Sequence, residues 1–121
     1  MTQSEMWCAI AVLFFVSTDY ITGVMKAIMQ GNLSSKKMRE GLGRKLAYLI
    51  LAFTAWFIDT LNMHLSLGFP VSVFTCVISG VCLIELTSII ENITAINPEL
   101  KNAAFMNIFT QNNTNPKHKE D

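Results

Sequence analysis

Three acidic side chains interrupt the apolar stretches of this sequence: Asp19, Asp59 and Glu85. A carboxylate at the centre of a membrane helix costs about 2.5–3.5 kcal/mol on insertion scales, and less toward the helix ends. Asp19 lies just past the middle of its apolar stretch, whereas the other two lie nearer the ends of theirs. Residues of this kind usually face protein or water. They are therefore the first candidates for a functional role, as polar pairing groups or as groups that line water.

The other reactive side chains form no recognised arrangement. Cys8, Cys76 and Cys82 all fall in apolar stretches, without the spacing of a metal site or a disulfide framework. His64 and His118 are isolated, and no nucleotide-binding or hydrolase motif is present. We therefore expect no enzymatic activity, no catalytic residue, no cofactor and no metal site.

The composition narrows the class of protein. Nine Lys and Arg balance nine Asp and Glu in 121 residues, and charged residues make up 15% of the chain, against roughly 25% in a typical soluble domain. This balance excludes nucleic-acid binding through overall basicity and a charge-rich disordered chain. The apolar residues gather in three long blocks, which predicts a small multi-pass membrane protein whose first partner is the lipid bilayer.

Three apolar stretches are candidates for membrane-spanning helices. Trp7–Ile28 and Phe69–Ile90 each hold 22 residues, and Leu46–Leu61 holds 16, against roughly 20 for a bilayer core about 30 Å thick. The short second span can be lengthened by Lys45 reaching to the interface and by Asn62–Leu67 at its other end. A soluble bundle of very apolar helices, and a two-span protein with one re-entrant segment, are the alternatives.

The ends of the third span give further boundaries. Pro70 is tolerated in a first helical turn, so the third helix is expected to begin at Gly68–Pro70. The helix is expected to continue to about Ile96, where Pro98 interrupts it. Residues 1–96 are thus predicted to form the membrane domain, residues 97–109 a short amphipathic segment at the interface, and residues 110–121 a disordered polar tail.

Basic residues predict the orientation, because they mark the cytoplasmic side of a membrane protein. All nine lie either around the connection between the first two spans or after the third span. The amino terminus is therefore expected outside and the carboxyl terminus in the cytoplasm. The basic segment would lie against anionic headgroups, although topology alone accounts for it and is the interpretation we favour. Its residues are Lys36, Lys37, Arg39, Arg44 and Lys45.

Helical spacing places several polar residues on shared faces. One face of the second span carries Lys45, Tyr48, Ala52, Ala55 and Asp59, and small residues let helices approach closely in lipid. The third span is polar on two nearly opposite faces, which one chain has few ways to hide. We therefore expect self-association, although Ser and Thr can also bond back to their own helix. The candidate oligomerisation or pore-lining residues are Asp19, Thr22, Gly23, Asp59, Ser72, Thr75, Ser79, Glu85, Ser88, Glu91 and Asn92.

Three stretches carry a resemblance to a known family. Asp19–Gly23, followed by Lys26, resembles the Asp-x-x-Thr-Gly segment of the phage holin family that includes clostridial toxin-secretion holins. Leu33–Lys45 is similar to the basic linker of that family, and Glu85–Asn92 is similar to the Glu-x-x-Ser-Ile-x-Glu-Asn signature that ends its third span. Ala95–Pro98 departs from the family, since many relatives have a Gly-x-Pro-x-Pro turn there.

The resemblance implies a function. Holins accumulate in the bacterial cytoplasmic membrane during phage infection, form homo-oligomers and open lesions at a set time. The lesions let an endolysin reach the cell wall and cause host cell lysis, and some relatives release large toxins instead. This implies a pore-forming, multi-pass protein with a functional link to an endolysin or toxin that needs no direct binding. Two alternatives remain open: a small ion or solute channel of fixed stoichiometry, and an accessory or antiholin subunit.

Overall fold

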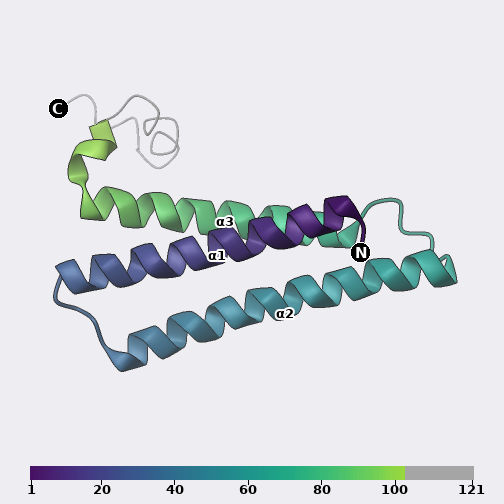
Figure 1. Cartoon of the computed structure of the whole chain (residues 1–121), viewed down its shortest axis with the longest axis horizontal. Helices are drawn as coiled ribbons and strands as arrows, with labels where there is room; N and C mark the ends of the chain where they lie inside the picture. The colour runs from purple at the N-terminus through teal and green to yellow at the C-terminus, as the bar shows by residue number, and fades with distance from the viewer. Residues whose placement is uncertain (103–121) are drawn as a thin grey trace, which may run out of the picture.

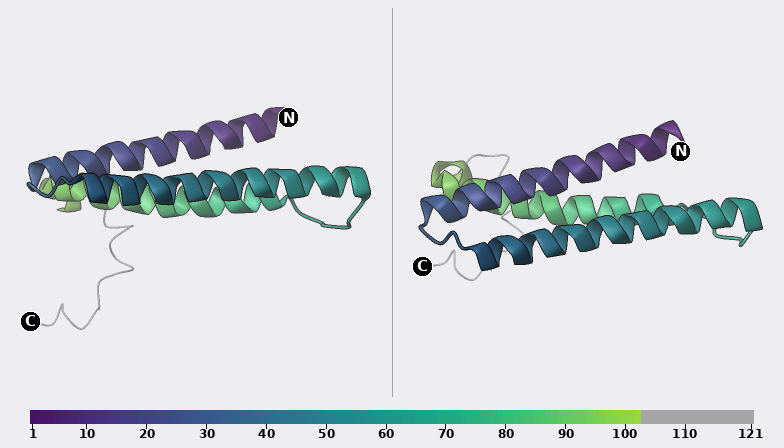
Figure 2. Two further views of the ribbon diagram at one scale, coloured as in Figure 1. Left: turned by 90° about the horizontal axis from the view of Figure 1, so that it is seen from below. Right: turned by 60° about the horizontal axis from the view of Figure 1, so that its bottom comes forward.

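The computed structural model describes residues 1–102, which form three long α-helices and one short 3-10 helix. The helices are α1 (Gln3–Met29), α2 (Ser35–Leu65) and α3 (Val73–Ile96), followed by the 3-10 helix η1 (Pro98–Asn102). Successive helices run in opposite directions along a common long axis (Figures 1 and 2), and α1 packs mainly against α3. Residues 103–109 of the expected amphipathic segment, and the expected tail, lie outside the described residues.

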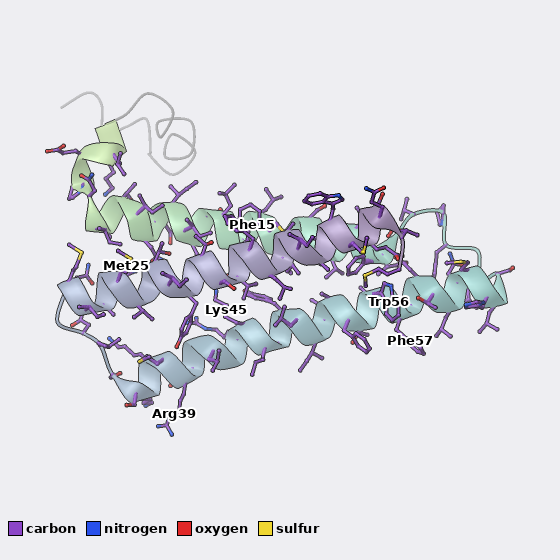
Figure 3. All side chains as sticks on the ribbon, viewed as in Figure 1. Phe15, Met25, Arg39, Lys45, Trp56 and Phe57 are labelled. Atoms are coloured by element: carbon purple, nitrogen blue, oxygen red, sulfur yellow. The ribbon has the colours of Figure 1, made fainter. Side chains whose placement is uncertain are left out.

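All three long helices are long and apolar enough to cross a membrane. The 24 residues of α3 rise about 36 Å at roughly 1.5 Å per residue, which exceeds a hydrocarbon core about 30 Å thick. Side chains project from all sides of the bundle (Figure 3), and many of the exposed ones are large and apolar, including Trp7, Phe14, Ile50, Phe53, Phe57, Leu83 and Ile84. The prediction of an all-helical protein with three membrane-length helices is confirmed.

The first two helices begin at hydrogen-bonded caps. Thr2 Oγ1 accepts from the backbone N–H of Glu5 at 3.2 Å, and the Glu5 carboxylate accepts from the N–H of Thr2 at 2.8 Å, which is the reciprocal capping arrangement. Ser34 Oγ accepts from the N–H of Lys37 at 3.2 Å at the start of α2. From there α2 continues through Gly41 without a break. The basic segment and the second apolar stretch therefore belong to one helix.

The start of α3 differs from the sequence-based expectation. The helix begins at Val73 with Ser72 as its N-cap, so Pro70 lies in the preceding loop and not in the first turn. Asp59 of α2 explains the difference, because its carboxylate accepts from Ser72 Oγ at 2.6 Å and from the N–H groups of Val73 and Phe74 at 2.8 and 2.9 Å. The first N–H groups of a helix have no partner within it, and a carboxylate at this point stabilises the start.

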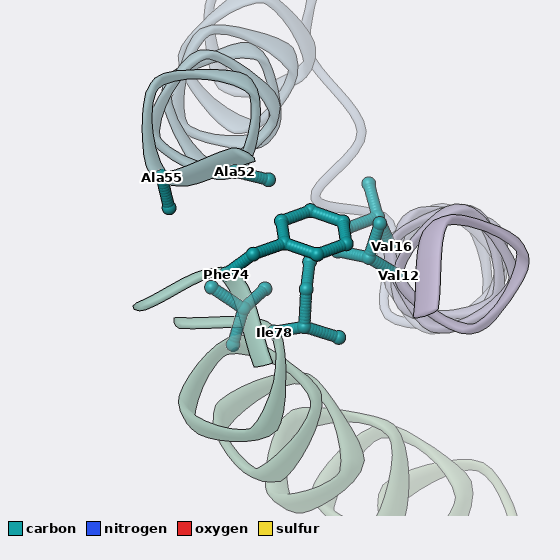
Figure 4. Packing of buried hydrophobic residues seen from close by; sticks show 7 residues of the cluster. Val12, Val16, Ala52, Ala55, Phe74 and Ile78 are labelled. Atoms are coloured by element: carbon teal, nitrogen blue, oxygen red, sulfur yellow. The ribbon is translucent and has the colours of Figure 1, made fainter. Parts of the chain in front are cut away.

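The buried apolar core lies in the half of the bundle nearest the amino terminus. The ring of Phe74 lies between the alanines of α2 and the valines of α1 (Figure 4). The core consists of Val12, Val16, Ala52, Ala55, Phe74, Ile78 and Val81. Two small side chains of α2 are fully buried in this core, and Tyr48, Leu49 and Trp56 of α2 pack against it in partly buried positions. Polar contacts of α2 add to this attachment.

Candidate functional site

A group of polar side chains joins all three helices beyond the apolar core. This polar cluster consists of Asp19 and Thr22 of α1, Lys45 of α2, and Glu85 and Asn92 of α3. The ammonium group of Lys45 forms ion pairs with Asp19 Oδ2 and with Glu85 Oε2, the latter at 2.6 Å. One side chain of α2 therefore contacts both other helices through opposite charges.

Asn92 of α3 links the cluster to α1. Its Nδ2 donates to Asp19 Oδ1 at 3.0 Å and lies 3.1 Å from Thr22 Oγ1. A Cβ atom added to Gly23 would lie 3.6 Å from the same Nδ2, an ordinary contact distance, so Gly23 adjoins the amide. Asp19 thus has the Lys45 ammonium at one carboxylate oxygen and the Asn92 amide at the other.

The cluster is buried and its polar atoms are paired. Relative exposure is 1% for Glu85, 7% for Asp19 and 7% for Asn92. Among the described residues, every buried side-chain nitrogen or oxygen has a hydrogen-bond partner, as an apolar surrounding requires. One ammonium group faces two carboxylates, so the cluster carries a formal charge of −1 when both are ionised. Removing the ammonium group would leave two buried carboxylates without a cation, which is strongly destabilising.

Lys45 occupies a different place from the one that the sequence suggested. The sequence predicts a position at the membrane interface with the other basic residues, but the ammonium group lies between the helices, against Asp19 and Glu85. The helical spacing already indicated this placement, because Lys45 shares one face of α2 with Ala52 and Ala55, which are buried. A lysine on the core-facing side of a helix needs a buried acid within reach of its long stem.

The buried acids have partners within the single chain, which removes one reason for self-association. Asp19 and Glu85 are neutralised in part by Lys45 of the same chain, so they do not by themselves oblige copies to cluster. Of the two polar faces of α3, the one that bears Glu85 and Asn92 is hidden within a single chain. The other face, with Thr75 and Ser79, is exposed.

The remaining candidate residues lie in two places. Asp59 and Ser72 meet at the start of α3, at the opposite end of the helices from Asn92, where they form the cap described above. Glu91 is exposed, and Ser88 is half-buried. Both line a pocket of about 490 Å³ beside the polar cluster, and Asp19 and Lys45 line it as well.

The three stretches that carry the family resemblance meet in the polar cluster. Asp19–Gly23 supplies an acid and a hydroxyl. Leu33–Lys45 supplies the ammonium group, and Glu85–Asn92 supplies the second acid and the amide. Residues that are far apart in the sequence are thus contacts of one another, which gives a single structural reason for three separate motifs.

Comparison with known proteins agrees with this arrangement. Residues 2–110 match the family described as the bacteriophage holin family. No curated protein and no solved structure matches the chain. The match does not distinguish the toxin-secretion subtype, which stays a prediction. Because it covers nearly the whole chain, and because three helices can cross a membrane, the protein belongs to the bacteriophage holin family and is a multi-pass protein of the bacterial cytoplasmic membrane.

Proposed function

We propose that this holin forms oligomers in the cytoplasmic membrane and permeabilises it, so that an endolysin reaches the cell wall. The observation that carries the proposal is the polar cluster, in which the three family stretches join three membrane-length helices. In the proposed orientation the amino terminus is outside, and the connector between α1 and α2 lies in the cytoplasm together with the basic first part of α2. Release of a large toxin is the same proposal with a different cargo.

The polar cluster supplies the hydrophilic groups that a water-filled lesion needs. In the single chain these groups are paired and hidden, so the protomer presents an apolar exterior to lipid. Separation of α2 from α1 and α3 would expose Asp19, Lys45 and Glu85 together. Breaking the buried pairs is costly unless water hydrates the charges. The closed protomer therefore persists until enough copies gather to enclose water, and self-association then follows from shared hydration of the opened faces.

The net charge of the cluster predicts how neutralising one of its acids changes the timing of permeabilisation. Asp19→Asn, or Glu85→Gln, leaves one ammonium group with one carboxylate, which costs less to keep buried than a cluster with net charge. We expect each variant to delay the loss of membrane potential relative to the wild type. The measurement is culture turbidity and a potential-sensitive dye after induction in a bacterial host, with and without a co-expressed endolysin, at matched protein levels.

The control is Glu99→Gln, because Glu99 is an exposed residue of η1 outside the cluster. It should cause permeabilisation on the wild-type schedule. If Asp19→Asn and Glu85→Gln both keep that schedule, the polar cluster does not govern opening. Selective conductance with continued growth would support the channel alternative instead, and permeabilisation only in the presence of a partner would support an accessory subunit.

A further inference from the structure

The pocket beside the polar cluster has features of a ligand site. Its volume is about 490 Å³, and it lies between α1, the connector to α2, the first part of α2 and the last part of α3. Three cationic side chains from two helices line it: Lys26, Lys37 and Arg44. Within residues 1–102 none of the three forms an ion pair, in contrast to Lys45.

The charge around the pocket favours an anion. Glu40 and Glu91 also line it, so three uncommitted cations stand against two carboxylates, outside the paired Lys45 and Asp19. The side chain of Arg44 is a planar donor suited to phosphate oxygens. An anion at the cationic side of the pocket would therefore gain direct contacts, with the two carboxylates limiting the strength of binding.

The rest of the lining fits an amphiphile better than a free ion. Val24, Leu33 and Met38 provide apolar surface, and Gln30 and Asn32 provide amides. The depth of the pocket in the membrane also fits a lipid headgroup. Lys26 follows Trp7 by 19 residues, about 28 Å of helical rise, so it reaches one boundary of a hydrocarbon core about 30 Å thick when Trp7 lies at the other.

The fold places only some residues of the basic segment at the pocket. The orientation of the protein in the membrane does not require this division. Lys37 and Arg44 line the pocket, whereas Lys36 and Arg39 do not, and Arg39 points away from the bundle (Figure 3). Positive charge fixes orientation whichever face of α2 carries it. Placement of two of these residues on a pocket, together with Lys26 of another helix, indicates a second role.

We propose that this pocket binds the phosphate group of an anionic glycerophospholipid, held by Lys26, Lys37 and Arg44. The headgroup hydroxyls lie toward the amides of the connector, and the glycerol end lies toward the apolar lining. Such a lipid bridges α1 and α2 beside the Lys45 contacts. The proposal rests on the location of the protein in the membrane and not on pore formation, so failure of either one leaves the other intact.

The test is native mass spectrometry of the purified full-length chain in detergent, titrated with phosphatidylglycerol. We expect the combined variant Lys26→Gln, Lys37→Gln, Arg44→Gln to bind at least about tenfold more weakly, since each basic residue near an anionic membrane surface contributes roughly fivefold. The matched control, Lys36→Gln, Arg39→Gln, Lys101→Gln, removes the same charge outside the pocket and should change binding by less than about threefold. A second variant, Glu40→Gln, removes a pocket carboxylate and should strengthen binding.

Several results would overturn the proposal. Equal losses in the pocket and control variants would mean diffuse attraction to basic charge. Phosphatidylcholine binding as tightly as phosphatidylglycerol would exclude an anionic-headgroup site, and inorganic phosphate competing at the same concentrations as the lipid would identify a free-phosphate site. Circular dichroism checks the helical content of the combined variant, and if it is misfolded, unchanged or weaker binding by Glu40→Gln decides against the proposal.

Discussion

Lys45 contacts both other helices with a single side chain. It pairs with one carboxylate on α1 and one on α3, on the helix face that also carries the buried Ala52 and Ala55. An ion pair in an apolar surrounding adds little stability compared with well-packed apolar residues, but loss of one partner leaves an uncompensated charge. The importance of Lys45 therefore lies in what its removal would leave behind.

Lys45→Met should destabilise the bundle by about 3–5 kcal/mol, because it leaves Asp19 and Glu85 buried without their cation. The measurement is the free energy of unfolding in mixed micelles, followed by circular dichroism during titration with a denaturing detergent. Adding Asp19→Asn and Glu85→Gln to Lys45→Met should restore most of the loss. Lys36→Met is the control at an exposed position, and equal stability of Lys36→Met and Lys45→Met would contradict the role given to Lys45.

At the scale of elements, polar side chains attach α2 to its neighbours at two separate points along the helix. Lys45 provides one attachment, and Asp59 provides the other by accepting from Ser72 and from two backbone N–H groups of α3. Asn62 adds a reciprocal pair of hydrogen bonds with the backbone of Phe69, at 3.2 and 3.3 Å. The loop and the start of α3 are therefore fixed by α2, and movement of α2 would have to carry this end with it.

Asp59→Ala should loosen the first turn of α3, since three donors lose their acceptor there. Each donor left without a partner costs about 1–3 kcal/mol where it is buried, so amide hydrogen exchange at Val73 and Phe74 should become faster. The control is Thr60→Ala, because the Thr60 hydroxyl bonds only to the carbonyl of Trp56 in its own helix. Unchanged exchange in Asp59→Ala would show that Ser72 alone fixes the start of the helix.

At the scale of the whole molecule, residues 1–102 expose many large apolar side chains, while the carboxylates of Asp19 and Glu85 are buried between the helices. Monomeric soluble proteins seldom expose apolar surface of this extent, whereas lipid tails solvate it without penalty. Basic residues gather at one end of the bundle, in the last turn of α1 at Lys26 and in the first part of α2, and this asymmetry gives the proposed orientation.

Cysteine labelling measures that orientation. In a variant with Cys8, Cys76 and Cys82 changed to Ser, we expect Ser4→Cys to react with a membrane-impermeant maleimide in intact spheroplasts before permeabilisation. Ser35→Cys, at the start of α2, should react only after the membrane is disrupted. The opposite pattern would reverse the proposed orientation, and labelling of both positions in sealed cells would mean that the two ends do not lie on opposite sides.

The sequence by itself determined the number and class of the helices. A backbone in lipid must satisfy its hydrogen bonds internally, so apolar stretches of sufficient length predict helices before any contact is known. It also singled out Asp19, Glu85 and Asn92, because polar groups in such stretches need partners. Helical spacing gives the face on which a residue lies, but not the rotation of that helix against its neighbours. Only the tertiary structure decided that Lys45 is the partner of both acids within one chain. It also decided that Asp59 moves the start of α3 to Val73. Both contacts depend on distances between residues that are far apart in the sequence.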